Sequence, residues 1–274
     1  GYNRAKKPMY FGENDTINYY FSKSQLIYSD KLAKFVVKAN ELTGGMVIKR
    51  IGKIYSYIFV DEIQDMAGYD LEIIKCLFSL NSDVLLVGDP RQVTYHTHDE
   101  AKYKKYTDGN IKEFIKQECS EFSVDIDETT LNKTYRNNKS ICKFANSIYS
   151  NFKPCEYVKH EPTGHDGVFF VSPSDVDAYL STYQPMQLRD TRKTSVNSTY
   201  PAINLGESKG LTFQRVLIYP TSKMLDWILD HKKEMKPQSK SKFYVGITRA
   251  EHSVAIVFDN KKGISVDGIT NFHF

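Results

Sequence analysis

The sequence lacks the features that mark membrane, secreted and zinc-binding proteins. No apolar run approaches the roughly 20 residues needed to span a bilayer, and no apolar segment follows a basic one at the N-terminus. The four cysteines, Cys76, Cys119, Cys142 and Cys155, are widely spaced and form no C-x-x-C pair, so neither a zinc site nor a disulfide framework is indicated. The simplest interpretation is a cytoplasmic protein with reduced thiols and no membrane partner.

The sequence also lacks a strong excess of either charge. The 274 residues carry a formal net charge of +4, and 41% of them are hydrophobic and 26% charged. This composition is ordinary for a globular protein with one large or two medium domains. The small positive balance is compatible with an anionic partner but does not by itself indicate one.

Two short apolar segments are predicted to be fully buried parallel strands that end in acidic residues. Residues 57–60 lead directly into Asp61 and Glu62, and residues 83–88 lead into Asp89. Ligands of open α/β sheets bind at the carboxyl ends of parallel strands, so Asp61 and Glu62 are candidates for handling a metal-bound phosphate. The alternative is that the two acids cap the following helix.

Strands and helices are expected to alternate along most of the chain. The predicted elements before residue 152 are one short helix before residue 30, helices between Ser29 and Gly44, at residues 69–80 and at residues 138–151, and a strand at Ser123–Leu131. From residue 168 to residue 258, further strands alternate with helices. The pattern predicts an α/β fold with parallel sheets in two successive units, divided near residue 130.

One segment combines lysines with aromatic residues. Lys102, Lys104 and Lys105 are interleaved with Tyr103 and Tyr106. Lysines can follow a phosphate backbone while tyrosines stack on bases, which makes this segment a candidate nucleic-acid contact. A solvated surface without a ligand is the alternative interpretation.

Five segments resemble, in the right order, motifs II to VI of the UvrD-like superfamily 1 DNA helicases. They are VDEIQD at residues 60–65, VGDPRQ at 87–92, LNKTYR at 131–136, ESKGLTF at 207–213 and YVGITRA at 244–250. The resemblance implies two RecA-like lobes of the P-loop NTPase type, with the C-terminal part of an incomplete first lobe at 1–128 and a compact second lobe at 129–274. It also implies ATP and Mg²⁺ as cofactors.

The same resemblance implies roles for individual side chains in ATP hydrolysis. Asp61 would bind Mg²⁺, Glu62 would act as the base for the attacking water, and Gln92 would couple the γ-phosphate to the DNA site. Arg136 and Arg249 would contact the phosphates and stabilise charge in the transition state, a role that suits the fixed fork of guanidinium donors. Surface arginines in ordinary ion pairs are the alternative for both.

Other positions are implied to contact the nucleotide or the strand. Lys209 and Gly210 lie where the family contacts both nucleotide and DNA backbone, and Tyr95 takes the place of an aromatic residue after motif III. Packing is the simpler interpretation of Tyr95 taken alone. Single-stranded DNA is the implied partner, contacted by Tyr95, Lys209 and the three lysines at 102, 104 and 105.

Three departures from the family pattern accompany this resemblance. The sequence has no G-x-x-x-x-G-K-[ST] phosphate loop, so we expect the chain to be the C-terminal part of a longer protein and to hydrolyse ATP poorly alone. His96 and His98 stand where the family has an aromatic and an arginine that engage DNA, and they are interpreted as surface residues rather than ligands. Thr212 replaces a glutamate of the commoner motif V.

The sequence therefore predicts a fragment of an ATP-dependent DNA helicase or translocase that couples hydrolysis to movement on single-stranded DNA. Some small relatives operate beside nucleases, which leaves an associated nuclease open as a partner. The alternative is a non-catalytic helicase remnant that binds nucleic acid or protein. The missing phosphate loop favours the remnant, whereas the intact set of five ATPase residues argues against it. A magnesium-dependent nuclease would not explain Arg136 or Arg249.

Overall fold

The computed structural model describes residues 11–95, 97, 101–158, 161–261 and 263–273. Their contacts divide the chain into two compact units: unit 1 contains residues 1–90 and 96–124, and unit 2 contains residues 91–95 and 125–274. The assignment of residues 1–128 and 129–274 to separate lobes stays a prediction. In the described part of the chain, no helix has the length and apolar character needed to cross a membrane.

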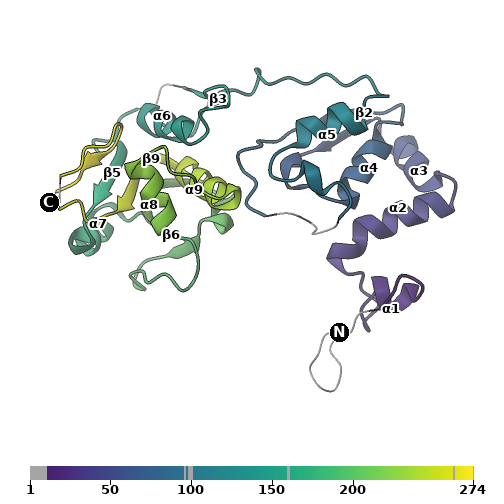
Figure 1. Ribbon diagram of the computed structural model, residues 1–274, viewed down its shortest axis with the longest axis horizontal. Helices are drawn as coiled ribbons and strands as arrows, with labels where there is room; N and C mark the ends of the chain where they lie inside the picture. Colours follow the sequence, from purple (N-terminus) through teal and green to yellow (C-terminus); the bar gives the residue numbers. More distant parts are fainter. Residues whose placement is uncertain (1–10, 96, 98–100, 159–160, 262, 274) are drawn as a thin grey trace. The chain divides into compact units, whose positions relative to one another are not determined.

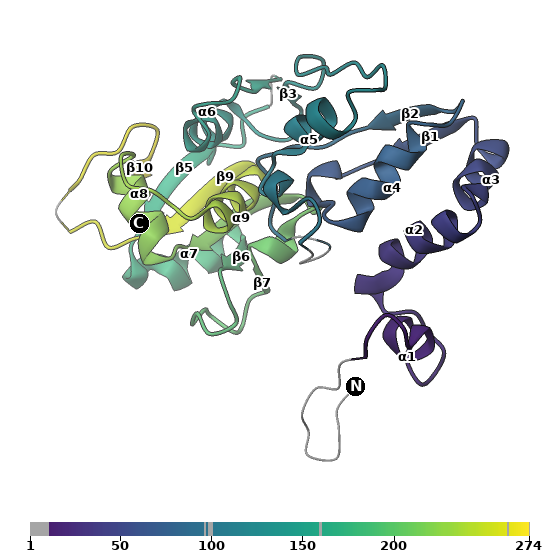
Figure 2. The same cartoon turned by 45° about the vertical axis from the view of Figure 1, so that its right-hand side comes forward.

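Unit 1 is a small α/β layer in which helices cover one face of a two-stranded parallel sheet (Figures 1 and 2). Its helices are α1 (Thr16–Tyr20), α2 (Leu32–Leu42), α3 (Met46–Ile54), α4 (Tyr69–Leu77) and α5 (Ile111–Glu118). Its strands are β1 (Tyr57–Val60) and β2 (Asp83–Leu86), with Tyr57 opposite Asp83 and Val60 opposite Leu86. The helix α4 connects the two strands, as the sequence predicts for a βαβ unit.

Side chains alternate along β1, so the sheet has one covered and one exposed face. Ile58 packs into a cluster with Ile48 of α3 and Ile74 of α4. Tyr57 and Phe59 point the other way and are 64% and 71% exposed. The expectation that this strand is fully buried is therefore wrong, because in the described residues only one layer of helices covers the sheet.

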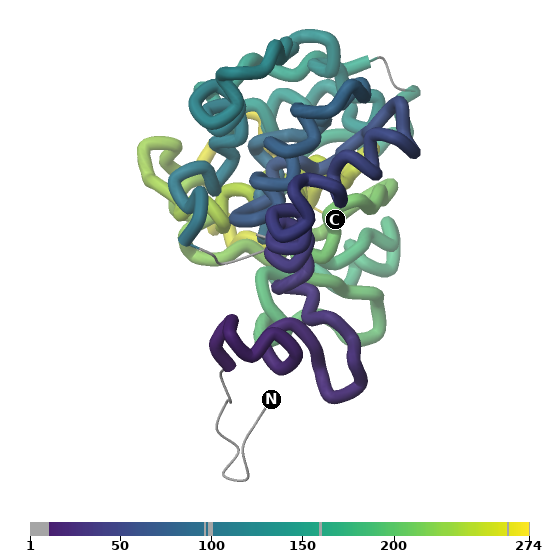
Figure 3. Tube along the Cα trace, turned by 90° about the vertical axis from the view of Figure 1, so that its right-hand side faces the viewer, coloured from purple at the N-terminus to yellow at the C-terminus, as the bar shows by residue number. Residues whose placement is uncertain are grey.

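All three overall views place α1 at the end of α2 that is remote from α3 (Figures 1, 2 and 3). Phe35 of α2 makes edge-to-face contacts with Tyr20 and Phe21, at ring-centroid distances of 5.3 Å and 5.5 Å. Lys34, the residue before Phe35 in the sequence, is buried and forms an ion pair with Glu13. The prediction of one short helix before residue 30 is confirmed, and residues 1–10 lie outside the described residues.

Unit 2 is built around a six-stranded parallel sheet with the strand order β10-β5-β9-β8-β6-β7. The strands are β5 (Gly167–Val171), β6 (Met186–Arg189), β7 (Ala202–Asn204), β8 (Phe213–Tyr219), β9 (Ala250–Val257) and β10 (Thr270–Asn271). The helices are α6 (Lys139–Ile148), α7 (Val176–Tyr183), α8 (Ser222–Leu229) and α9 (Pro237–Thr248). A separate parallel pair, β3 (Lys133–Thr134) and β4 (Glu156–Tyr157), lies beside α6.

Helices cover both faces of this sheet and form the core of unit 2 with it (Figure 1). On one face Phe144 of α6, Trp227 of α8 and Phe243 of α9 make edge-to-face contacts. On the other face Leu180 of α7 packs with Leu217 of β8. The second halves of β8 and β9, residues 216–219 and 254–257, are continuous apolar runs, which suit strands that are buried on both faces. The predicted α/β fold with parallel sheets is confirmed, and the RecA-like type of the two lobes stays a prediction.

Some expectations about individual elements are wrong. Ser123–Leu131 forms no strand: the segment is largely exposed, and Asp127 turns it by accepting hydrogen bonds from the backbone N–H groups of Thr129 and Thr130. Its alternation of apolar and polar residues imitates a strand, but pairing requires a neighbouring strand edge, and none in the described part of the chain pairs with it. The sequence pattern also fails to predict α3, α5 and α9.

Candidate functional site

The two acids predicted to follow β1 lie at the carboxyl end of the parallel pair. Val87 donates to the carbonyl of Val60 at 2.8 Å and Ile63 donates to the carbonyl of Val87 at 3.1 Å, so the pairing continues beyond the strand ends. Asp61 is exposed and Glu62 is partly exposed. Glu62 has a φ of 54°, a left-handed conformation that costs a non-glycine residue roughly 1–3 kcal/mol. Backbone strain is thus concentrated at the residue predicted to act as the base.

Gln64 holds the end of β1 against the segment that follows β2. Its Oε1 accepts a hydrogen bond from the backbone N–H of Asp89 at 3.0 Å, and its Nε2 donates to the carboxylate of Glu62. Gly88 permits this approach, because a Cβ at that position would lie 2.3 Å from Oε1 of Gln64. The sequence assigns Gln64 no role, since a buried amide that joins two strand ends becomes visible only in the folded sheet.

The carboxylates at this edge suit the Mg²⁺ of a metal–nucleotide complex rather than a metal held by protein ligands alone. Among the described residues, no group of three His, Cys, Asp or Glu side chains could hold a metal ion. Mg²⁺ usually takes one or two carboxylates together with phosphate oxygens and water. Asp61 meets that requirement with an exposed carboxylate whose Oδ1 accepts from the N–H of Glu62 at 2.8 Å.

Within unit 2, three of the predicted ATPase residues meet at the C-terminal end of α9. Arg249 is 3% exposed, and its guanidinium donates from Nε to the carbonyl of Val245 at 3.2 Å and from Nη2 to Oε1 of Gln92 at 3.3 Å. Arg136 donates from Nη1 to the carbonyl of Thr248 at 3.2 Å. Burial lowers the pKa of the Arg136 guanidinium, which nevertheless stays charged at neutral pH. Segments that are far apart in the sequence thus bring two arginines and a glutamine together.

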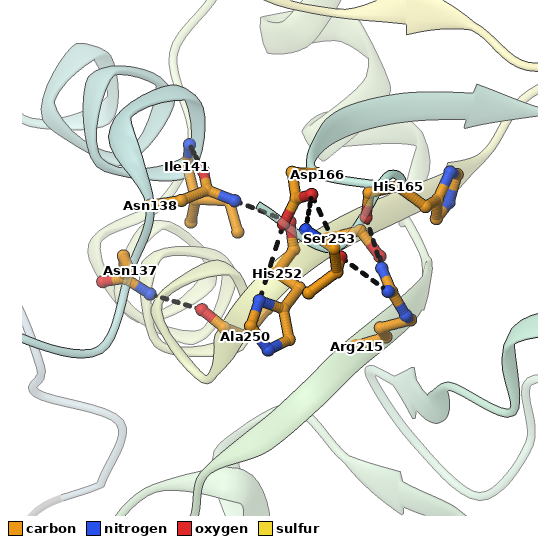
Figure 4. Close-up of polar contacts among 10 residues, drawn as sticks. Asn137, Asn138, Ile141, His165, Asp166, Arg215, Ala250, His252 and Ser253 are labelled. Atoms are coloured by element: carbon orange, nitrogen blue, oxygen red, sulfur yellow. Dashed lines mark hydrogen bonds and ion pairs between the residues drawn. The ribbon is translucent and has the colours of Figure 1, made fainter. Parts of the chain in front are cut away.

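Two asparagines join the start of α6 to the start of β9 (Figure 4). Asn137 is buried and donates to the carbonyl of Ala250 at 2.7 Å. Asn138 caps α6 by accepting from the N–H of Ile141 at 3.1 Å, and it also donates to the carbonyl of His252 at 2.6 Å. These bonds fix the segment that carries Arg136 to β9, the strand that directly follows Arg249.

Further polar contacts join β9 to the neighbouring strand β8 and to the segment before β5 (Figure 4). Oδ1 of Asp166 lies 3.5 Å from Nδ1 of His252. Arg215 of β8 donates to Oγ of Ser253 at 3.0 Å and to the carbonyl of His165. The sequence does not predict this network, because its members come from three segments that meet only when the sheet forms.

The residues predicted to contact nucleotide or strand in unit 2 also lie close together. Nζ of Lys209 lies 5.7 Å from the ring centroid of Tyr95, which is within cation–π range, and the Tyr95 side chain is 55% exposed. Gly210 has a φ of 79°, a conformation that favours glycine. The roles of these residues stay predictions. His96 and His98, interpreted above as surface residues, lie outside the described residues.

The lysine–tyrosine segment of unit 1 is held by internal contacts. Lys102 and Lys105 form ion pairs with glutamates of α4 and α5 at 3.0 Å and 3.4 Å. Tyr106 is 4% exposed and donates to Glu118 at 2.6 Å, so its ring is not available for base stacking. Lys104 begins a short 3₁₀ turn. Contact of the three lysines with a strand stays a prediction, whereas the interleaved tyrosines serve packing more than the sequence suggests.

Comparisons with known proteins give one family and several distant structures. No match was found among curated proteins. Two solved structures, an arterivirus nonstructural protein 10 helicase and the PRRSV helicase, are 18% and 16% identical to the chain; each match covers 76% of it, with TM-scores of 0.45. The C-terminal domain of a possible DNA helicase from Lactobacillus plantarum WCFS1 is 12% identical over 50% of the chain and 98% of that domain, with a TM-score of 0.32.

The chain spans 41% and 37% of the lengths of the two viral helicases, so these structures represent longer proteins. The family match is more extensive. A family model described as the viral superfamily 1 RNA helicase core domain matches residues 43–258, which is well over half of the 274 residues. The motif order had indicated superfamily 1, and the family match confirms the assignment at that level: the chain belongs to the viral superfamily 1 RNA helicase core domain family.

Proposed function

We propose that the chain is the part of an ATP-dependent helicase or translocase that supplies the catalytic carboxylates and the phosphate-contacting arginines. In this proposal the enzyme is of the UvrD-like type and couples ATP hydrolysis to movement on single-stranded DNA. The observation that carries the proposal is the hydrogen bond from the buried Arg249 to Gln92, two residues that are 157 positions apart and belong to two helicase motifs. Membership of a superfamily 1 helicase family supports it.

The chain's own residues have separable tasks in this proposal. Bound Mg²⁺–ATP would supply the phosphoryl group and neutralise part of its charge. Glu62 accepts the proton of the attacking water, and Gln64 orients the Glu62 carboxylate through its Nε2 donor. Asp61 presents the exposed carboxylate to the metal. The guanidinium of Arg249 donates a hydrogen bond to Gln92, so a substitution of either residue changes the position of the other side chain.

The motif resemblance and the family match differ on whether the bound nucleic acid is DNA or RNA. The motif resemblance favours DNA, whereas the matching family is described by its RNA helicases. Proteins that follow a single strand through phosphate contacts and stacking bind largely independently of base sequence, and their affinity falls with salt. Single-stranded DNA and single-stranded RNA of the same sequence are therefore compared in the same assay.

The test uses the natural full-length polypeptide that contains this chain, with ATP hydrolysis measured in the presence of each strand. A single strand is expected to stimulate hydrolysis. Glu62→Gln is expected to lower turnover by about 10²–10⁴-fold, because the proton acceptor is lost, while the Kd for ATP stays within about threefold. Glu121→Gln, which removes an exposed carboxylate paired with Lys75, is the matched control and should leave turnover unchanged. Turnover that survives Glu62→Gln would show that another residue is the base.

A non-catalytic binding module is the second candidate, and the lack of a phosphate loop in these 274 residues favours it. It predicts a different result in the same assay. The full-length polypeptide would bind a single strand, would show no strand-stimulated hydrolysis, and would respond to neither Glu62→Gln nor Arg249→Lys.

A further inference from the structure

A basic pocket lies on α3, the helix that comes just before β1 in the chain. The cavity, here called the α3 pocket, has a volume of about 500 Å³, and its charged and polar lining consists of Lys49, Arg50, Lys53, Ser79 and Asn81. The volume is in the range of small-ligand sites, and the lining contains no acidic residue.

The three cations of the α3 pocket are exposed and carry uncompensated charge. In the described part of the chain, none of Lys49, Arg50 and Lys53 takes part in an ion pair, and α3 itself contains no acid. Lys102 and Lys105 differ in this respect, since both are neutralised by glutamates. The charge of unit 1 that remains available to an anion is therefore concentrated on α3 more than on the segment that the sequence favours.

Helix stability does not account for this arrangement. Lys53 lies in the last turn of α3, where a cation interacts favourably with the helix dipole. Lys49 and Lys53 are four positions apart on one face, and like charges at this spacing destabilise a helix by roughly 0.2–0.5 kcal/mol. Arg50 adds a third positive charge beside them. Apart from the contact of Lys53 with the helix dipole, the cluster has no compensating ion pair in the described part of the chain, and its like charges cost some stability.

The position of the α3 pocket separates it from the candidate ATPase residues. Lys53 lies just before β1, and Asn81 lies just before β2, so the pocket is at the amino ends of the two strands. Asp61 and Glu62 follow the carboxyl end of β1, and each strand of four residues is about 13 Å long. An anion in the pocket would therefore not be the nucleotide handled by these carboxylates.

We propose that the α3 pocket binds the phosphodiester backbone of a single-stranded nucleic acid. Lys49 and Lys53 are separated by about 6 Å along the helix axis, and a row of charges on one helix face suits a chain of phosphates better than a single phosphate group. Met46 and Leu80 supply apolar lining that a sugar or base can contact. The inference rests on the proposed nucleic-acid function and assigns part of the strand contact to α3.

The experiment compares two triple variants of the whole chain that lose the same charge. One is Lys49→Gln, Arg50→Gln, Lys53→Gln; the control is Lys75→Gln, Lys116→Gln, Lys223→Gln, three lysines that lie in surface ion pairs. A fluorescently labelled single-stranded oligonucleotide is titrated with each protein over a range of salt concentrations. The α3 variant is expected to bind at least about tenfold more weakly than the control and to lose about 2 units of the slope of log K against log salt.

Each outcome of the titration decides something. If the unmodified chain does not bind the strand, the proposed function and this inference both fail. If the chain binds but the α3 variant matches it, or if both variants weaken equally, the inference alone is overturned. Inorganic tripolyphosphate is the second probe. If the α3 variant loses tripolyphosphate binding but binds the oligonucleotide as well as the unmodified chain does, the inference is also overturned. Thermal unfolding of the α3 variant is expected at or slightly above the unmodified temperature, since like-charge repulsion is removed.

Discussion

Single buried polar side chains fix the candidate sites in both units. Gln64 is 3% exposed and uses its amide to join the carboxylate of Glu62 to the backbone of Asp89. The sequence places the two acids correctly at a strand end, because a short apolar run that ends in acidic residues is a local signal. It does not reveal Gln64, whose partner lies 25 positions away and is reached only through the parallel register of β1 and β2.

His165 is a second residue whose environment is visible only in the fold. Its ring stacks between Tyr183 and Phe169, at centroid distances of 3.8 Å and 4.3 Å, and its Nε2 lies 2.8 Å from the hydroxyl of Tyr179. Burial, assisted by the charge of Arg215, lowers the pKa of His165 to about 4. The imidazole is therefore neutral in the folded protein throughout the neutral range.

This lowered pKa predicts a pH-dependent loss of stability. The unfolded histidine titrates near 6.5, so between about pH 6.5 and 4 the unfolded state binds the additional proton and is favoured as pH falls. The contribution is complete above about pH 6.5 and amounts to about 3 kcal/mol lost by pH 4. Among the facing charged groups, Arg215 lowers this pKa and Asp166 raises it.

Urea unfolding at several pH values measures this effect. His165→Phe, which keeps a stacking ring, is expected to remove the histidine contribution and flatten the dependence in this window. His231→Gln changes an exposed histidine and should retain the original slope. Equal slopes for the unmodified chain and His165→Phe would contradict the assignment.

At the scale of elements, helices with a clear apolar periodicity and apolar strands are the features that the sequence predicts best. α2, α4 and α6 lie where their apolar periodicity places them, because each buries one side of the helix. The strand expected at Ser123–Leu131 fails for a physical reason: alternation describes a strand's faces but does not supply a pairing edge. α9 is missed because Pro237, Gly246 and several polar residues weaken its local helical signal, although tertiary packing buries most of its second half.

The start of α6 is an element boundary that also fixes the site. Asn138→Ala is expected to remove both the cap bond to Ile141 and the bond to the carbonyl of His252, lowering the free energy of unfolding by about 2–3 kcal/mol. Thr221→Ala is the matched control, because Thr221 caps α8 through Met224 and its side chain makes no second hydrogen bond in the described part of the chain. The control is expected to lose about 1 kcal/mol.

Thermal unfolding followed by circular dichroism compares the two variants. Asn138→Ala should unfold several degrees below Thr221→Ala. Similar unfolding temperatures would mean that the bond to His252 contributes nothing beyond the cap.

At the scale of the whole chain, the order of the motifs reveals the superfamily, whereas the division of the chain into units does not follow from it. Residues 91–95 belong to unit 2 although they come directly after the β2 segment of unit 1. Gln238 donates to the carbonyl of Thr94 at 3.3 Å, and the guanidinium of Arg91 lies 5.0 Å from the ring centroid of Tyr244. Contacts between residues more than 140 positions apart decide this assignment, and a linear reading of the sequence gives no signal for them.

This chain alone is expected to hydrolyse ATP poorly. A nucleotide site needs backbone amides and a lysine that hold the β- and γ-phosphates, and the 274 residues contain no phosphate-loop sequence that supplies them. We therefore expect Mg²⁺-dependent hydrolysis to stay at least about 10³-fold below the usual enzymatic range of about 1–10³ s⁻¹, with or without a single strand. Phosphate release is the measurement, and strand binding by the same sample shows that the protein is folded. Strand-stimulated hydrolysis that Glu62→Gln abolishes would contradict this prediction and would mean that other groups in the chain hold the phosphates against the carboxylates at the end of β1.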